Sequence, residues 1–265
     1  MRELALQAAQ TGDVILLLDF ANAFNTVDRN LMLRLAAAHC PELTNLTYWL
    51  YQREPHLVTC TGHVVRSSTG TQQGCRLSNP LFALTMEYIS RKISTIPGIR
   101  AKMFFWDDTA LVGTPKAIAK AASIIQNLSD ETRLYLKWKK CHLYGASSSI
   151  DESRAMFAQG FAADITLHKN FDIVYLKAPI GSDQFVKSWL ENKLENLGKV
   201  IHSVARMPYA HEACTLLRSC AAECRVVYLM RILPPRQMTC FLQEFDKLLK
   251  KGFEKILGMW LPEKW

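Results

Sequence analysis

The sequence lacks any long apolar segment. None of its uninterrupted apolar runs approaches the roughly 20 residues that span a bilayer, and residues 1 to 7 lack the apolar core of a secretion signal. There is also no internal repeat and no low-complexity tract. With 49% hydrophobic and 21% charged residues, the composition is that of an ordinary globular protein. We therefore expect an intracellular chain with no membrane span.

The patterns of zinc sites and disulfide frameworks are missing as well. The eight cysteines include no Cys-x-x-Cys pair. His211-Glu212 begins like the helix motif of zinc proteases, but Thr215 stands where that motif needs its second histidine. We therefore expect no zinc site.

Two adjacent aspartates are the most informative feature that is present. Residues 103 to 112 read as an apolar run, a polar turn and a second apolar run, which predicts a β-hairpin with Asp107 and Asp108 side by side at its tip. Adjacent carboxylates repel unless a cation lies between them, so the pair indicates a divalent metal site. The alternative is local, because Asp favours turns through hydrogen bonds to its own backbone.

The first part of the chain predicts an α+β fold. An apolar run from Asp13 to Phe20 reads as a buried strand with Asp19 at its exposed end, where the alternative role for Asp19 is capping the next helix. Residues 147 to 153 look like a loop. We expect helices over 27–39, 77–93 and 115–128 and further hairpins over 56–68 and 171–180, which together make a mixed sheet backed by helices.

The last part of the chain predicts helices only. Residues 189–204, 210–232 and 237–257 have helical periodicity, interrupted by Pro208 and by Pro234-Pro235. We therefore expect two domains, residues 1–183 and residues 184–265. Basic residues outnumber acidic ones in the second domain, and the whole chain has a formal charge of +8, which permits binding to a polyanion without requiring it.

If the strand that ends at Asp19 neighbours the hairpin with Asp107 and Asp108, the three carboxylates converge at one edge of a sheet. Such a cluster can hold two magnesium ions roughly 3.5 to 4 Å apart, an arrangement that serves phosphoryl and nucleotidyl transfer. The sequence alone does not establish this convergence.

Five segments, in order, resemble the motifs of reverse transcriptases of the non-LTR retrotransposon type. Together they span about residues 13 to 181, so their combination is far more specific than any one of them. The segments are Leu16-Leu-Leu-Asp-Phe-Ala-Asn-Ala-Phe-Asn-Thr-Val-Asp-Arg29, Gly70-Thr-Gln-Gln-Gly-Cys-Arg-Leu-Ser-Asn-Pro-Leu-Phe82, Phe105-Trp-Asp-Asp108, Leu134-Tyr-Leu-Lys-Trp-Lys-Lys-Cys141 and Val174-Tyr-Leu-Lys-Ala-Pro-Ile-Gly181.

The resemblance implies an RNA-directed DNA polymerase with a palm, a mixed and mainly antiparallel sheet backed by helices, followed by a helical thumb. It implies two Mg²⁺ ions, with Mn²⁺ as an alternative, held by Asp19, Asp107, the supporting ligand Asp108 and the Phe20 carbonyl. Its partners would be an RNA template, a DNA primer and deoxynucleoside triphosphates. By the same resemblance we expect nuclear residence.

Four further roles follow from the resemblance. Phe24 would exclude the 2′-hydroxyl of an incoming nucleotide, although alone it could equally be a core aromatic. Gln73 and Gly74 would begin a helix beside the nascent base pair, where glycine allows close backbone approach. Lys140 would protonate or neutralise the leaving pyrophosphate, although the run Lys137-Trp-Lys-Lys140 also suits a solvated basic face.

The sequence departs from the family pattern in several places. Trp106 replaces a small or aliphatic residue, and Lys177 replaces the glycine of a tight turn, which predicts a distorted hairpin. Only 18 residues precede Asp19, where the family places a fingers region, so we expect a truncated polymerase whose fingers are supplied by other sequence of the full-length element. The alternatives are a non-catalytic remnant that binds nucleic acid or acts as a scaffold, and an RNA-directed RNA polymerase, which Phe24 disfavours.

Overall fold

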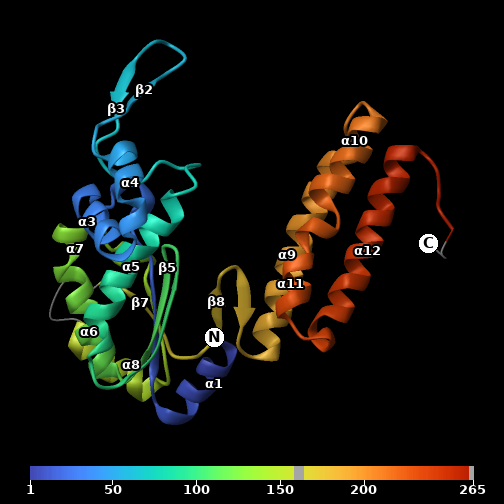
Figure 1. Cartoon of the computed structure of the whole chain (residues 1–265). Coiled ribbons are helices and arrows are strands. Elements are labelled where there is room, and N and C mark those ends of the chain that lie inside the picture. Colours follow the sequence, from blue (N-terminus) through green and yellow to red (C-terminus); the bar gives the residue numbers. More distant parts are fainter. Residues whose placement is uncertain (158–163, 263–265) are drawn as a thin grey trace. The chain divides into compact units, whose positions relative to one another are not determined.

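A computed structural model describes residues 1–157 and 164–262 of the chain. The chain forms two compact units, Met1–Phe171 and Asp172–Trp265, which are described separately below (Figure 1). The division falls before the boundary expected at residue 183, so the hairpin of residues 173–180 belongs to the second unit. None of the helices in these described ranges is long and apolar enough to cross a membrane.

A five-stranded mixed sheet lies at the centre of the first unit. Its strand order is β4-β5-β1-β6-β7, and all neighbours are antiparallel except β6 and β7, which are parallel. The α+β class expected from the sequence is thereby confirmed. The strands are β1 (Val14–Leu18), β4 (Ile99–Phe105), β5 (Asp108–Gly113), β6 (His142–Tyr144) and β7 (Thr166–His168).

Strand β1 is the innermost part of this sheet because apolar side chains bury both of its faces. Val14, Leu16 and Leu18 belong to the main core cluster, and Ile15, on the opposite face, is also fully buried. Period-two alternation cannot reveal such a strand, since a strand buried on both faces reads as a continuous apolar run.

The helices around the sheet are α1 (Arg2–Thr11), α2 (Ala23–Thr26), α3 (Arg29–His39), α4 (Thr44–Tyr51), α5 (Ser78–Ser94), α6 (Pro115–Asn127), α7 (Ser129–Thr132) and α8 (Ser147–Phe157).

Local signals account for most of these elements. Asp28 caps α3 by accepting a hydrogen bond of 2.8 Å from the Leu31 amide, as its sequence position predicts. Thr114 caps α6 in the same way, ahead of Pro115. The helices expected over 27–39, 77–93 and 115–128 are confirmed, and so is the hairpin of β2 (His56–Val58) and β3 (Val64–Arg66).

The loop expected at residues 147–153 is wrong, because this segment forms the start of α8. Ile150 and Phe157 both enter the core, and the Ser149 hydroxyl donates a 2.7 Å hydrogen bond to the Gly12 carbonyl. Serine is neutral to poor in helix interiors. Here the burial of two large apolar side chains outweighs that weak preference.

The second unit begins with the hairpin of β8 (Ile173–Tyr175) and β9 (Ala178–Ile180), as expected. Its two turn residues, Leu176 and Lys177, both take left-handed backbone angles, with φ of 48° and 63°. Non-glycine residues pay roughly 1 kcal/mol each for this conformation. The hairpin forms with Lys177 in place, and the Tyr228 hydroxyl supports it with a 2.6 Å hydrogen bond to the Leu176 carbonyl.

The rest of the second unit is helical. The continuous helix expected over 210–232 is wrong, because a π-helical turn (Leu217–Ala221) and a 3-10 turn (Glu223–Arg225) interrupt it. The Arg225 guanidinium donates to the Cys220 carbonyl, which replaces a regular backbone partner at the break. The α-helices are α9 (Asp183–Val204), α10 (Ala210–Leu216), α11 (Val227–Ile232) and α12 (Pro235–Leu257).

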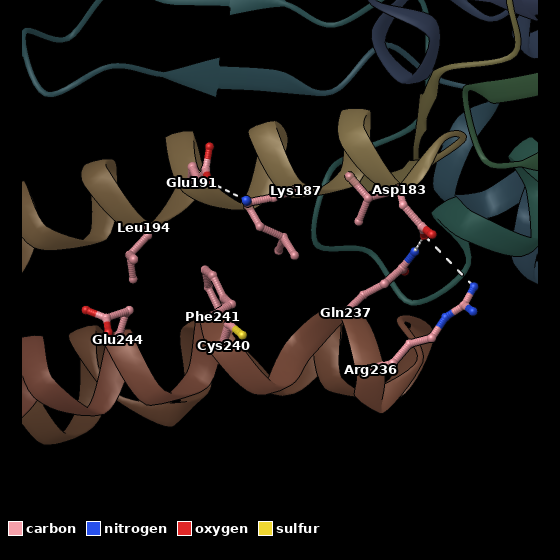
Figure 2. A pocket seen from close by; sticks show the side chains of 11 residues that line it. Asp183, Lys187, Glu191, Leu194, Arg236, Gln237, Cys240, Phe241 and Glu244 are labelled. Carbon is pink, nitrogen blue, oxygen red and sulfur yellow. Dashed lines mark hydrogen bonds and ion pairs between the residues drawn. The ribbon is translucent and has the colours of Figure 1, made fainter.

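Helices α9 and α12 pack together and enclose a cavity of about 460 Å³ between their side chains. Figure 2 shows Asp183 accepting a 2.6 Å hydrogen bond from the Gln237 amide and pairing with Arg236 at 3.9 Å. Phe241 lies farther along the cavity. The polar contacts at one end therefore join the two helices where the apolar core of the second unit begins.

Candidate active site

The register of the sheet brings the predicted carboxylates to one end of neighbouring strands. Leu18 of β1 lies opposite Thr109 of β5, and one further step of the same antiparallel register places Asp19 opposite Asp108. Asp107 immediately precedes Asp108. The strand pairing therefore brings Asp19 and the hairpin of Asp107 and Asp108 to the same end of the sheet, and the convergence of their carboxylates on a metal site stays a prediction.

The tip of the hairpin differs from the expectation. Asp108 is the first residue of β5 and pairs with Phe105, so the two turn residues are Trp106 and Asp107 rather than Asp107 and Asp108. Trp106 takes φ 57°, a conformation that costs a bulky residue roughly 1 kcal/mol. Its ring contacts Phe105 edge-on at 6.2 Å and lies 6.1 Å from Phe24, and these contacts help hold it in place.

The backbone of Asp19 is fixed from the other side of β1. Its carbonyl accepts a 2.9 Å hydrogen bond from the Lys137 amide, and the Ala21 amide donates at 2.8 Å to the Tyr135 carbonyl. Phe20 lies between these bonds, opposite Leu136, and its side chain is buried. Because successive carbonyls of an extended chain point to opposite edges, the Phe20 carbonyl is directed toward the β5 side, where Asp108 lies.

Two polar groups that the sequence interpretation missed lie beside Asp19. Burial, together with the negative charge of Asp19, raises the pKa of the Cys141 thiol to about 11, and a hydrogen bond to the Asp19 backbone partly opposes this. Burial lowers the pKa of His142, and Asp19 partly opposes this. Both groups are therefore neutral near pH 7. The short β-like run His142-Leu-Tyr144 after Cys141 was their only sequence signal.

His142 belongs to a small cluster at the edge of the sheet. Its Nδ1 lies 3.1 Å from Nε2 of His168, whose ring stacks on Tyr144 with 4.4 Å between centroids. Burial and the neighbouring His142 lower the pKa of His168. The hydrogen bond between the rings requires a neutral partner that accepts.

Phe24, Gln73 and Gly74 gather next to this carboxylate end. The Phe24 ring stacks on buried Phe82, with centroids 4.2 Å apart, and the Gln73 amide donates to the Asn25 side chain at 3.4 Å. Gln73 and Gly74 do not begin a helix, since α5 starts at Ser78. They lie in the preceding turn, where Gly74 has φ +92° and faces open space.

The close backbone approach expected at Gly74 occurs instead at Gly70. A side chain there would lie 2.3 Å from the carbonyl carbon of Asn25, and φ is +70°. The Gly70 amide donates to the Val27 carbonyl, and the Thr71 amide donates to the Phe24 carbonyl. Glycine at position 70 therefore lets the two segments that carry Phe24 and Gln73 run in direct backbone contact.

Arg29 is the site residue that sequence reasoning passed over. It is buried at 7% exposure and its guanidinium donates to the carbonyls of Gly70 (2.7 Å), Thr69 (3.0 Å) and Ser67, and to the Ser67 hydroxyl. Burial lowers its pKa, while Tyr51 and Glu54 oppose this. Burial also raises the pKa of Tyr51, which lies under the guanidinium, to about 12. Its position at the start of α3, directly after the capping Asp28, gave no sequence signal of burial.

Lys140 ends a 3-10 turn, Trp138–Lys140, in the loop that pairs with Asp19 through Lys137. Its side chain is exposed. Within the described ranges, no group of three or more His, Cys, Asp and Glu side chains is close enough to hold a metal ion. Asp19, Asp107 and Asp108 therefore lie at the same end of the sheet without forming a metal-binding group in these ranges.

The fold and site agree with one family. A model described as reverse transcriptase (RNA-dependent DNA polymerase) matches residues 2–159, which is more than half of the chain, so the chain belongs to this family. The matched segment contains every residue of the candidate site.

Solved structures of telomerases are similar to the chain at low sequence identity. They include the apo telomerase of Candida tropicalis (TM-score 0.46, 9% identity, covering 96% of this chain and 49% of that chain). They also include Candida albicans telomerase with a fragment of telomeric RNA (TM-score 0.46, 8% identity, 98% and 49%). The chain therefore spans about half the length of these telomerases. No curated protein matches it.

Replacing Arg29 with Leu is expected to lower the free energy of unfolding by about 2–4 kcal/mol, because buried carbonyls lose their donors. Urea denaturation measures the effect. Arg34→Leu is the matched control, since Arg34 is exposed on the same helix and should change stability by no more than about 0.5 kcal/mol. Equal losses in the two variants would contradict the bridging role of Arg29.

The histidine pair should make stability fall in acid. Because the folded pKa values of His142 and His168 are lowered, the unfolded chain binds protons first, and stability is lost as pH falls below about 6.5. His168→Gln should reduce the difference in unfolding free energy between about pH 7.5 and pH 5. His63→Gln, on the exposed hairpin, should leave that difference unchanged. If His63→Gln reduces the difference and His168→Gln does not, the histidine pair does not cause the loss of stability in acid.

Proposed function

We propose that the chain is the RNA-directed DNA polymerase domain of a non-LTR type retroelement, in which the first unit is the palm and the second is the thumb. The observation that supports the proposal is the strand register that pairs Leu18, the residue before Asp19, with Thr109, the residue after Asp108, in a member of the reverse transcriptase family. In the proposed function, cations bound between the three carboxylates would offset their mutual repulsion and serve nucleotidyl transfer.

The donors fit magnesium chemistry. Asp19, Asp107, Asp108 and the Phe20 carbonyl are hard oxygen ligands, and Mg²⁺ typically takes only one or two protein carboxylates, with waters and substrate phosphates completing its shell. An incomplete protein cage is therefore compatible with Mg²⁺, or with Mn²⁺ in its place. When bound, two such ions would polarise the primer hydroxyl and stabilise the leaving oxygen.

The remaining site residues would position the nucleotide. Phe24, supported from behind by Phe82, would close the space that a 2′-hydroxyl needs. Gln73 would hydrogen-bond the nucleotide or template, and Gly74, with open space before it, would allow the base pair to approach. Lys140, on the loop tied to Asp19, would neutralise charge on the leaving pyrophosphate or protonate it.

The proposed partners are an RNA template, a DNA primer and deoxynucleoside triphosphates. The surplus of basic residues in the helices of the second unit supports contact with nucleic-acid phosphates, since such contacts are mainly electrostatic and independent of base sequence. We propose residence in the nucleus.

Asp107→Asn should lower the rate of primer extension on an RNA template, with deoxynucleotides and magnesium, by at least roughly 100-fold. The substitution removes one charge from an exposed turn position where Asn is also favoured, so the fold should persist. The measurement is extension of a labelled DNA primer, resolved to single nucleotides.

Asp151→Asn is the control, because this carboxylate lies on the exposed face of α8, where it pairs with Lys169. It should extend primers like the unmodified chain. Absence of extension by the unmodified chain, despite measurable binding of the primer-template duplex, would favour the non-catalytic remnant over the polymerase.

Phe24→Val should raise ribonucleotide incorporation relative to deoxynucleotide incorporation by roughly 10- to 100-fold, because it opens space beside the sugar. Steady-state incorporation of single nucleotides measures the ratio. Phe82→Leu weakens the same ring stack from the buried side but keeps the Phe24 ring, so it should change the ratio less than Phe24→Val. If the unmodified chain already incorporates ribonucleotides efficiently, Phe24 is no steric gate and the RNA polymerase alternative is favoured.

A further inference from the structure

A second polar cavity lies in the first unit, away from the carboxylates. It encloses about 470 Å³ between the start of α3, the end of α4 and the loop of residues 67–70. We call it the Arg34 cavity, and none of its lining residues is among the catalytic, metal or nucleotide residues assigned above. The residues that matter here are Asn30, Arg34, Tyr48, Glu54, Ser68 and Arg133.

Among the described residues, the charges around the cavity leave one arginine without an ion-pair partner. Arg29, at the back, is committed to the carbonyls of the 67–70 loop, and Glu54 is close enough to influence its pKa. Arg133 pairs with Asp28 at 3.4 Å. Arg34 is exposed and forms no ion pair with any residue that the structure describes, so the cavity has a net positive charge.

The other groups on the wall suit a nucleoside. Asn30 and Gln52 supply amides, Ser68 supplies a hydroxyl, and half-buried Tyr48 supplies an aromatic ring. Amides and hydroxyls hydrogen-bond sugar and base edges, aromatic rings accept stacked bases, and guanidinium groups bind phosphate. The volume lies within the usual range for small-ligand sites.

We propose that the Arg34 cavity binds one nucleotide unit, with its phosphate on Arg34 and its nucleoside against Tyr48 and the neighbouring amides. The same chemistry can come from a free nucleotide or from one nucleotide of a strand. We assign it to a single-stranded segment of the nucleic acid, a choice that rests on the proposed function.

The loop next to the cavity supports the choice of a strand. Ser68 and Thr69 line the cavity, while the same loop continues through Gly70 to Gln73, which contacts Asn25 beside the candidate active site. A strand that follows this loop would reach both places, whereas a free nucleotide would occupy only one. The cavity would thus guide a strand toward the carboxylate end of the sheet.

The test measures binding without catalysis. A fluorescently labelled single-stranded RNA is titrated with the whole chain in EDTA at about 50 mM salt, where phosphate contacts contribute strongly. Arg34→Glu should weaken binding roughly tenfold and make it less sensitive to salt. Glu54→Gln removes a carboxylate from the wall and should tighten binding roughly twofold, a gain that misfolding cannot produce.

Arg91→Glu is the control, since Arg91 is an exposed arginine on α5 outside the cavity. It should bind like the unmodified chain. An equal loss in Arg91→Glu and Arg34→Glu, or no loss in Arg34→Glu, would overturn the site. Displacement of the RNA by low concentrations of a nucleoside monophosphate would overturn its assignment to a strand.

The outcome can be separated from that of the proposed polymerase activity. Asp107→Asn should retain RNA binding that depends on Arg34, even though it does not extend primers. If the unmodified chain extends primers but Arg34→Glu binds RNA as tightly as the unmodified chain, the cavity proposal alone fails. If binding depends on Arg34 but no extension occurs, the cavity stands and the polymerase proposal fails.

Discussion

The pairing of strand β1 on both of its edges is the constraint on which the candidate site depends. One edge meets β5 in a register that leads from Leu18 and Thr109 to Asp19 and Asp108. The other edge is held by β6 and, beyond Leu18, by the backbone bonds of Asp19 and Ala21 to residues 137 and 135. Because these bonds are between backbone groups, the position of Asp19 needs no side-chain contact of its own. Its carboxylate is left available at the strand end.

Much of this arrangement could be predicted from the sequence because it depends on local patterns. An apolar run that ends in Asp19, an Asp108 at the start of a second run, and Asp28 before a helix each have a direct structural meaning. The order of the motifs then predicted which carboxylates belong together. The register of β1 and β5 could not be predicted from the sequence, because it is set by hydrogen bonds between residues more than 90 positions apart.

The features that were missed depend on distant partners. Arg29 is buried only because the 67–70 loop folds over it and accepts its hydrogen bonds through backbone carbonyls. No sequence pattern near Arg29 predicts this contact. Helix α8 forms from serines because Ile150 meets a core built elsewhere. The turn at Trp106 and Asp107 is fixed by the pairing of Phe105 with Asp108, which a sequence pattern places only to within a residue.

The two polar neighbours of Asp19, Cys141 and His142, carry no charge near pH 7. Burial keeps the Cys141 thiol protonated and His142 neutral, so these two neighbours add no positive charge beside Asp19. Bringing like charges together raises their free energy unless a cation joins them. In the proposed polymerase function, a divalent ion would supply the positive charge that these neighbours lack, and a built-in cation would compete with that ion for the same carboxylate oxygens.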